Sequence, residues 1–136
     1  MTTTAEPETQ PLRAVVRTLP GTVESASHAR RLVADRLIGW GRQDLVDAAE
    51  LVVSELVSNS VRHTGCRRVG VAIQLDGRTV TIAVRDTSTE LPFVIQAGQD
   101  DIHGRGMALV ARIAHRWGVV PQPRGKTVWA ELRHPL

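Results

Sequence analysis

The sequence has little of several residue types that would point to particular classes of protein. It contains one cysteine, Cys66, no tyrosine, and only four aromatic residues, which are three Trp and one Phe. A single cysteine excludes an intrachain disulfide framework and a zinc site built from several cysteines. No uncharged apolar run approaches the roughly 18 residues that a membrane-spanning helix requires. The scarcity of aromatic rings also leaves few platforms on which nucleic-acid bases would stack.

Lysine is scarce as well, although the chain is basic. There are 17 basic and 14 acidic side chains, which gives a net charge of +3, and 16 of the 17 basic residues are arginine. The isoelectric point is about 10.4. A nucleic-acid-binding protein usually gathers its basic residues on one face, but here the densest groups are the pairs Arg30-Arg31 and Arg67-Arg68. We therefore expect no direct contact with nucleic acid, a function that only the isoelectric point favours.

The length of 136 residues is typical of one domain. Residues 1–11 are polar and acidic, and they lack the apolar segment of a signal peptide. They are predicted to be a disordered leader, followed by a single domain over residues 12–136. Without a signal peptide or a membrane-spanning run, we expect the protein to be cytoplasmic and to have no contact with a membrane.

The spacing of apolar residues predicts the order of the elements. Residues 12–19 are predicted to be an edge strand, and apolar residues three and four apart predict helices over about 22–40, 45–63 and 107–117. Alternation over 69–75 and 80–84 around Asp76-Gly77 predicts a β-hairpin, and 128–132 is predicted to be the last strand. The expected fold is α+β, a two-layer sandwich in which helices pack on one face of a mixed, mostly antiparallel sheet. Residues 87–103 are predicted to be a long functional loop or lid.

Three polar residues lie in one row along the second predicted helix. Glu55, Asn59 and His63 are spaced four residues apart, so that their side chains lie on the same face. The oxygens of a carboxylate and an amide suit magnesium, and the imidazole suits a phosphate. The alternative interpretation of this spacing is a solvated stripe on an amphipathic helix.

Two further sites have the residue types of a nucleotide-binding protein. Asp86 ends a hairpin strand just before the long loop, where it is either an acceptor for a ligand's amino group or a turn-forming residue. Gly104-Arg105-Gly106 is predicted to lie between that loop and the third helix, where a helix N-terminus would bind an anion. The alternative there is an ordinary turn from loop to helix.

Gly125-Lys126-Thr127 resembles the end of a P-loop, but the context does not fit. The first glycine of that motif would fall at Val120, and the segment leads into a predicted strand instead of a helix. Lys126 is therefore predicted to lie in a turn before an edge strand, and Thr127 remains a candidate polar contact at the start of that strand.

Taken in order, these segments resemble the GHKL ATPase superfamily, which includes type II topoisomerases, histidine kinases and mismatch-repair ATPases. The segment from Glu55 through Asn59 to His63 resembles the N-box of that superfamily, and Asp86 falls at the position of its adenine-binding aspartate. The segment 104–109 resembles the second glycine box, and Thr127 matches the late threonine. The resemblance covers residues 12–133 and is greatest to the small anti-sigma-factor serine kinases of high-GC bacteria. The first glycine box differs, because both of its glycines are missing after Asp86.

The resemblance implies a Bergerat-type ATP-binding fold, with ATP and Mg²⁺ as cofactors. It implies that Asn59 holds the metal, that Glu55 is the catalytic base and that Asp86 accepts from the adenine amino group. His63, Thr127 and the segment Gly104, Arg105 and Gly106 would complete the nucleotide site. The implied function is that of a serine/threonine kinase, which phosphorylates an anti-anti-sigma-type protein and sequesters a sigma factor.

A second function is compatible with the same residues. In this alternative, bound nucleotide sets the affinity for a protein partner and no phosphate is transferred. Retention of both Glu55 and Asn59 favours the kinase, and the two missing glycines favour the binding module. A symmetric homodimer is compatible with either function.

Overall fold

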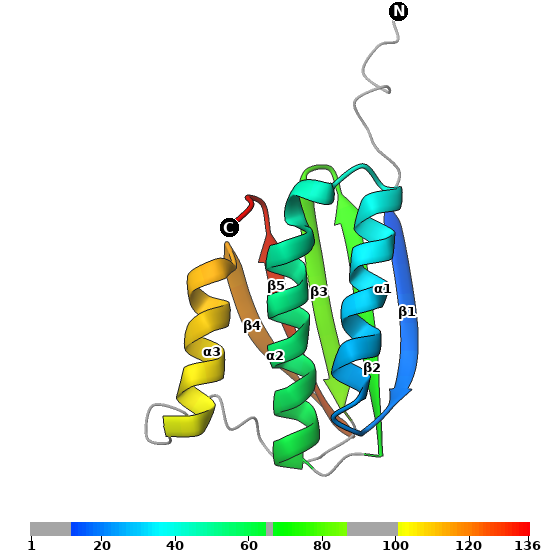
Figure 1. Ribbon diagram of the computed structural model, residues 1–136. Coiled ribbons are helices and arrows are strands. Elements are labelled where there is room, and N and C mark those ends of the chain that lie inside the picture. Colours follow the sequence, from blue (N-terminus) through cyan, green and yellow to red (C-terminus); the bar gives the residue numbers. More distant parts are fainter. Residues whose placement is uncertain (1–11, 65–66, 87–100) are drawn as a thin grey trace, which may run out of the picture.

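The computed structural model describes residues 12–64, 67–86 and 101–136, and forms two layers (Figure 1). The predicted leader, residues 1–11, and residues 87–100 of the predicted lid lie outside the described residues. The elements in chain order are β1 (Arg13–Pro20), α1 (Ser25–Gly39), the short 3₁₀ helix η2 (Gln43–Leu45), α2 (Val46–Thr64), β2 (Arg68–Asp76), β3 (Thr79–Asp86), α3 (Asp101–Ile113), β4 (Arg116–Gln122) and β5 (Gly125–Leu132).

The five strands form one sheet in the order β1-β2-β3-β5-β4. All four pairings of adjacent strands are antiparallel, and the predicted α+β sandwich is confirmed. The predicted hairpin is formed by β2 and β3, in which Asp76 pairs with Thr79 across a two-residue turn. Gly77 in that turn has a φ of 63°, a conformation that glycine adopts without steric cost.

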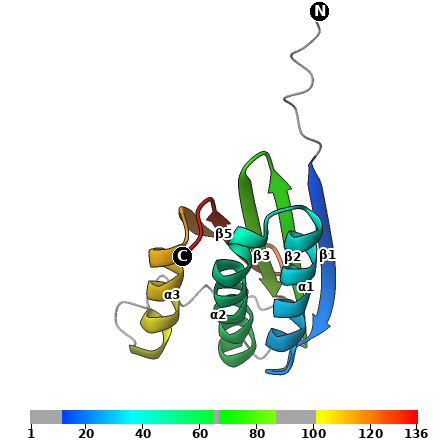
Figure 2. The ribbon, with the colours of Figure 1, turned by 45° about the horizontal axis from the view of Figure 1, so that its top comes forward.

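The helices cover one face of the sheet, and the hydrophobic core lies between the two layers (Figures 1 and 2). Alternate residues of β2 and β3 are buried, so that one side of each strand faces the helices. The same alternation in β5 buries Lys126, Val128, Ala130 and Leu132. Among the described residues, no helix is both long and apolar enough to cross a membrane.

The third helix and the strand after it differ from the sequence prediction. The helix was expected to continue to Trp117, but α3 ends at Ile113 and β4 begins at Arg116. The side chains of Trp117 and Val119 pack against the core from β4, so their spacing continues the apolar pattern of the helix by coincidence. Pro121 lies within β4, an edge strand in which proline is tolerated.

The start of α3 also differs from the prediction. The long loop was expected to continue to residue 103, but α3 begins at Asp101. The segment 104–106 therefore lies in the fourth to sixth positions of the helix instead of before it. Only the first four N–H groups of a helix lack an intrahelical acceptor, and these belong to residues 101–104. Backbone contacts to an anion would therefore come from the first turn and not from Arg105 or Gly106.

The sheet face opposite the helices holds a second group of contacts between β4 and β5. Trp129 lies opposite Gly118 in the register, and a Cβ atom built on Gly118 would stand 2.8 Å from the indole ring. The guanidinium of Arg116 lies 5.8 Å from the centre of the same ring and forms an ion pair of 2.8 Å with Glu131. The hydrogen bond from Arg116 lowers the pKa of Glu131 below its ordinary value. An aromatic ring over a glycine of an edge strand is a known means of stabilising such a strand.

Replacing this glycine is expected to destabilise the protein. Gly118→Ala forces the added methyl group against the Trp129 ring, and we expect the free energy of unfolding to fall by about 1–3 kcal/mol, as in other overpacked sites. The control is Gly39→Ala at the end of α1, where no heavy atom lies within 4 Å of the added Cβ. That change is expected to leave stability unchanged or to raise it by up to about 1 kcal/mol. Urea denaturation of both variants measures the difference, and equal effects would contradict the assigned contact.

Candidate functional site

The predicted polar residues gather at one end of the molecule. At this end α2 and β3 finish, and α3 and β5 begin (Figure 1). Two described contacts join the elements here, one between α2 and β3 through Ser60 and Asp86, and one between α2 and α3 through Asn59 and Met107. Elements that are far apart in the sequence therefore place their polar residues around the C-terminal half of α2.

Asp86 forms a buried ion pair with Lys126. The register of β3 and β5 sets these two residues opposite each other, and both side chains point to the helix side of the sheet. The Lys126 Nζ atom lies 2.7 Å from Asp86 Oδ2, and Ser60 Oγ donates to the same oxygen at 3.2 Å. Asp86 is 0% and Lys126 7% exposed. Two charges at this depth require each other, because removing one leaves the other buried without compensation.

Sequence reasoning missed the role of Lys126. The residue was predicted to lie in a turn, but β5 begins at Gly125 and includes it. Two signals in the sequence pointed to its burial. Lys126 is the chain's single lysine, and it precedes Val128 by two residues, which places it on the apolar side of an alternating strand.

Asn59 is oriented by a weak contact on one side of its amide. Its Nδ2 atom donates to the sulfur of Met107 at 3.3 Å, and a thioether is only a weak acceptor. Its Oδ1 atom is buried and has no hydrogen-bond partner among the described residues. Buried oxygens without a partner are rare in folded proteins, and an ion or a water at the site is one common reason for them. The amide oxygen therefore has the chemistry of a metal ligand.

Glu55 lies one helical turn before Asn59 on the same face of α2. Its side chain is half-buried. Within the described part of the chain no hydrogen bond or ion pair holds the carboxylate, so it is available to a ligand or to an attacking hydroxyl group. The carboxylate and the amide oxygen thus form the part of the predicted polar row that the structure describes.

Other predicted site residues are less directly placed. The side chains of His63 and of residues 104–106 lie outside the described part of the structure, although their backbones belong to α2 and α3. Thr127 is not brought together with Asp86. It lies opposite Arg85 in the register, on the sheet face away from the helices, and its hydroxyl group donates to Gln122 at 3.0 Å. The residue beside Asp86 is Lys126 instead.

The described residues contain no cluster of three or more His, Cys, Asp and Glu side chains suited to a metal ion. A magnesium ion here would therefore have Asn59 as a ligand and would take most of its other ligands from phosphate oxygens and water. This is the usual arrangement for Mg²⁺ at nucleotide sites, where the ion keeps several waters. The orphaned Oδ1 atom of Asn59 fits that arrangement.

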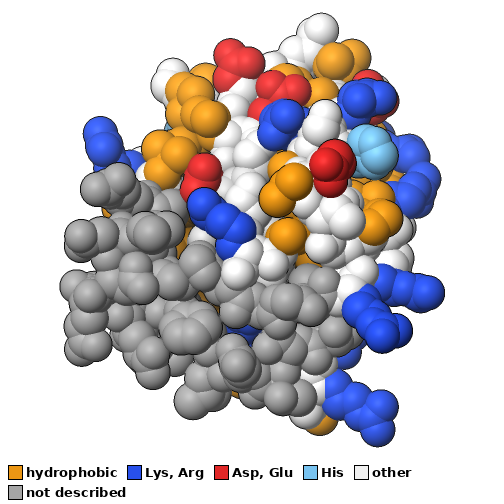
Figure 3. All heavy atoms as spheres, turned by 60° about the horizontal axis from the view of Figure 1, so that its bottom comes forward, with side chains coloured by type: hydrophobic (Ala, Val, Ile, Leu, Met, Phe, Trp, Pro, Cys, Tyr) orange, Lys and Arg blue, Asp and Glu red, His pale blue; other side chains and the backbone are white. Residues whose placement is uncertain are grey.

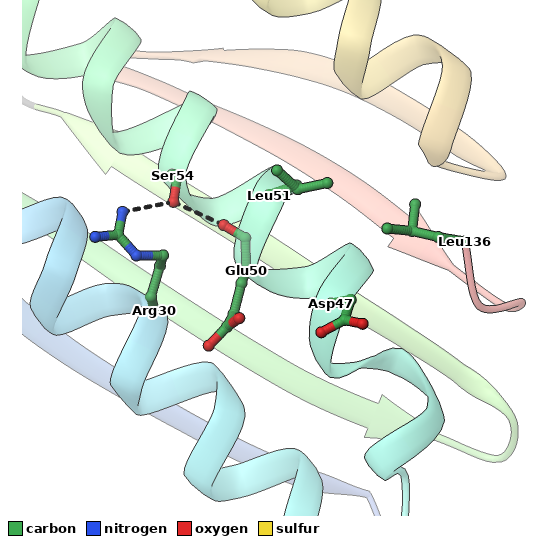
Figure 4. A pocket seen from close by; sticks show the side chains of 6 residues that line it. All are labelled: Arg30, Asp47, Glu50, Leu51, Ser54 and Leu136. Atoms are coloured by element: carbon green, nitrogen blue, oxygen red, sulfur yellow. Dashed lines mark hydrogen bonds between the residues drawn. The ribbon is translucent and has the colours of Figure 1, made fainter.

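Two surface features lie outside this site. A shallow cleft between α1 and α2 is lined by Arg30, Asp47, Glu50, Leu51, Ser54 and Leu136 (Figure 4). Within this cleft, Arg30 donates a hydrogen bond to Ser54 at 2.9 Å.

The basic side chains form the second feature. When the end of the molecule that carries the site faces the viewer, Lys and Arg side chains gather mainly along one side (Figure 3). Neither feature includes a residue of the polar row, so the cleft supplies control positions for variants of the site.

The ion pair leads to a prediction about stability. Lys126→Met leaves the Asp86 charge buried, and Asp86→Asn leaves the Lys126 charge buried. Each change is expected to lower the free energy of unfolding by about 3 kcal/mol or more. The double variant contains neither charge, so its loss should be clearly smaller than the sum of the two single losses. Urea denaturation of the four proteins measures this coupling, and additive losses would show that the two groups do not depend on each other.

Comparison with known proteins agrees with this fold. Residues 18–132 match the family described as "Histidine kinase-like ATPase domain". A similar solved structure is the crystal structure of the RsbU and RsbW domains of Rv1364c from Mycobacterium tuberculosis. It has a TM-score of 0.67 and 19% identity, and the match covers 90% of this chain and 32% of that chain. At this identity the likeness shows a shared fold alone. No curated protein matches the chain. The family match covers most of the sequence, and the chain belongs to the histidine kinase-like ATPase domain family.

Proposed function

We propose that this protein is an ATP-binding regulator that transfers the γ-phosphate of ATP to a serine or threonine of a protein partner. The observation that carries the proposal is the buried Oδ1 atom of Asn59, one helical turn from the Glu55 carboxylate, because neither group has a hydrogen-bond partner among the described residues. The family match and the fold of the solved neighbour support nucleotide binding at this place. The roles proposed below for Asn59, Glu55 and Asp86 are those that the sequence resemblance implies.

Asn59 would hold the magnesium ion through its amide oxygen. When bound, the ion neutralises charge on the phosphates and orients them for transfer. The protein contributes a dry, fixed oxygen whose orientation is set by the contact of Nδ2 with Met107. That contact also ties α2 to α3, so the metal ligand lies where both helices meet.

Glu55 would act as general base for the attacking hydroxyl group. The carboxylate accepts the proton from the serine or threonine of the partner as the oxygen attacks phosphorus, and the bond between phosphorus and the leaving oxygen of ADP breaks. A half-buried side chain is reachable by a second protein. Asp86 would accept a hydrogen bond from the 6-amino group of adenine at the other side of α2.

The proposed partners are an anti-anti-sigma-type protein as phosphate acceptor and a sigma factor as the protein that is sequestered. They are supported by the resemblance of the polar row to anti-sigma-factor kinases and by the solved neighbour, which comprises RsbU and RsbW domains. This chain spans about a third of the length of that neighbour.

A nucleotide-gated binding module is the second candidate. It is favoured by one observation on Glu55, because no described side chain orients this carboxylate as a base, whereas catalytic bases are usually held by a second group. The missing glycines after Asp86 favour it as well. In this case ATP or ADP would set the affinity for the partner without phosphate transfer.

Asn59→Leu separates the role of this residue in binding from its role in the fold. Leucine has a shape similar to asparagine and removes the buried oxygen that has no described partner, so the unfolding free energy of the nucleotide-free protein should stay equal or rise by about 1 kcal/mol. Mg²⁺-ATP should raise the melting temperature of the wild type, since it binds only the folded state, and should not raise that of the variant. Thermal melts with and without Mg²⁺-ATP measure both effects. If Mg²⁺-ATP raises the melting temperature of the variant as much as that of the wild type, Asn59 does not belong to the nucleotide site.

Glu55→Ala tests whether phosphate is transferred. Loss of a general base is expected to slow transfer by about a hundredfold or more while ATP affinity changes little. The matched control is Glu50→Ala, a half-buried glutamate of the same helix that lines the α1–α2 cleft (Figure 4). The measurement is transfer of labelled γ-phosphate to anti-anti-sigma-type proteins, beside calorimetric ATP binding. If the wild type binds ATP and an antagonist but labels none, the binding module replaces the kinase.

A further inference from the structure

Lys126 has more hydrogen-bonding capacity than the described residues use. Its ammonium group carries three N–H donors, and its one polar contact among the described residues is with Asp86 Oδ2 at 2.7 Å. The residue is 7% exposed, so bulk water supplies little compensation. A buried cation with unused donors is costly unless something else accepts from it.

The choice of lysine is also informative. Arginine provides 16 of the 17 basic side chains, and the single lysine stands at this position. A guanidinium is a wide planar fork that suits bidentate contact with one carboxylate, whereas an ammonium is compact and directs its donors to several acceptors at once. The compact group fits a position where an acceptor of a ligand lies beside the Asp86 carboxylate.

We propose that Lys126 is a specificity-determining residue that donates a hydrogen bond to ring nitrogen N1 of adenine. The inference rests on the proposed nucleotide site, in which Asp86 accepts from the 6-amino group. Adenine presents that amino donor and the N1 acceptor side by side on one edge. The pair presents the complementary order, a carboxylate acceptor next to an ammonium donor.

The same arrangement would reject bases of the opposite polarity. In hypoxanthine and guanine the substituent at position 6 is an oxygen acceptor and N1 carries a hydrogen. In the same pose, the oxygen would face the Asp86 carboxylate and the N1–H group would face the Lys126 ammonium. Both contacts are repulsive and leave buried groups unpaired, and such mismatches discriminate strongly between ligands. The ion pair thus fixes the order in which donor and acceptor must appear.

Nucleotide analogues test the contact in the unmodified protein. In 1-deaza-ATP a C–H group replaces N1, and we expect calorimetry with Mg²⁺ to give an affinity at least about tenfold weaker than for ATP, because the Lys126 donor loses its acceptor. In the control, 7-deaza-ATP, the change lies away from this edge, and the affinity should stay close to that of ATP. Equal affinity for ATP and 1-deaza-ATP would overturn the proposal.

A variant separates recognition of N1 from a structural role. Lys126→Met keeps most of the side-chain stem and removes the donors. If Lys126 contacts N1, the variant loses the preference of the wild type and binds ATP and 1-deaza-ATP with equal affinity, whatever the common loss caused by leaving Asp86 without its partner. If it only holds Asp86, both nucleotides weaken by the same factor and the preference for ATP persists, which overturns the proposal. Far-ultraviolet circular dichroism identifies a variant that has not folded.

Selective labelling gives a third measurement that needs no variant. Because the chain has one lysine, protein grown with ¹⁵N-lysine has a single side-chain ammonium resonance. We expect ATP to shift this resonance and 1-deaza-ATP to shift it much less, and equal shifts would contradict the contact. If the wild type binds no nucleotide, the proposed function fails together with this inference. If ATP binds but N1 is irrelevant, only the inference fails.

Discussion

The pairing of β3 with β5 sets the buried charges around which the candidate site is arranged. Its register sets Asp86 opposite Lys126 on the helix side of the sheet, and neither charge is tolerable at that depth without the other. A shift of one residue in either strand would turn one of these side chains to the opposite face and leave its partner alone. The two charges therefore stabilise one register over its neighbours. Ser60 joins α2 to the same carboxylate oxygen, so the helix is positioned by the pair as well.

Adjacent residues of α2 then face different neighbours. Successive residues of a helix are about 100° apart around its axis, and so Ser60 faces the sheet while Asn59 faces Met107 of α3. In the proposed site, the two sides of α2 would therefore bind different parts of the nucleotide. The base would bind between α2 and the sheet, and the phosphates would bind between α2 and α3. A single turn of helix would thus set both the direction of the nucleotide and the side from which a partner's hydroxyl group approaches Glu55.

The sequence predicted the parts that depend on local pattern. The β2–β3 hairpin follows from alternation around Asp76-Gly77, and α2 follows from a long helical pattern without Gly or Pro. β4 was missed because Trp117 continues the spacing of the preceding helix, and periodicity alone cannot show that the chain has already changed direction at His115. The partner of Asp86 was missed for a related reason. Strand pairing is a contact between distant segments, and the sequence of one segment alone does not determine its register.

A residue that matches a motif by its position in the sequence can lie on the wrong face of a strand, because side chains alternate between the two faces. The resemblance to the superfamily points to Thr127, one residue after Lys126, but a step of one residue along a strand moves the side chain to the other face. Here Thr127 bonds to Gln122 on the face away from the helices, and Lys126 occupies the position beside the aspartate. A hydroxyl group at that position would be neutral and would be able to donate or accept, whereas an ammonium only donates. In the proposed site, a lysine in place of a hydroxyl residue would therefore change which edges of a ligand can bind, without a change in the fold around it.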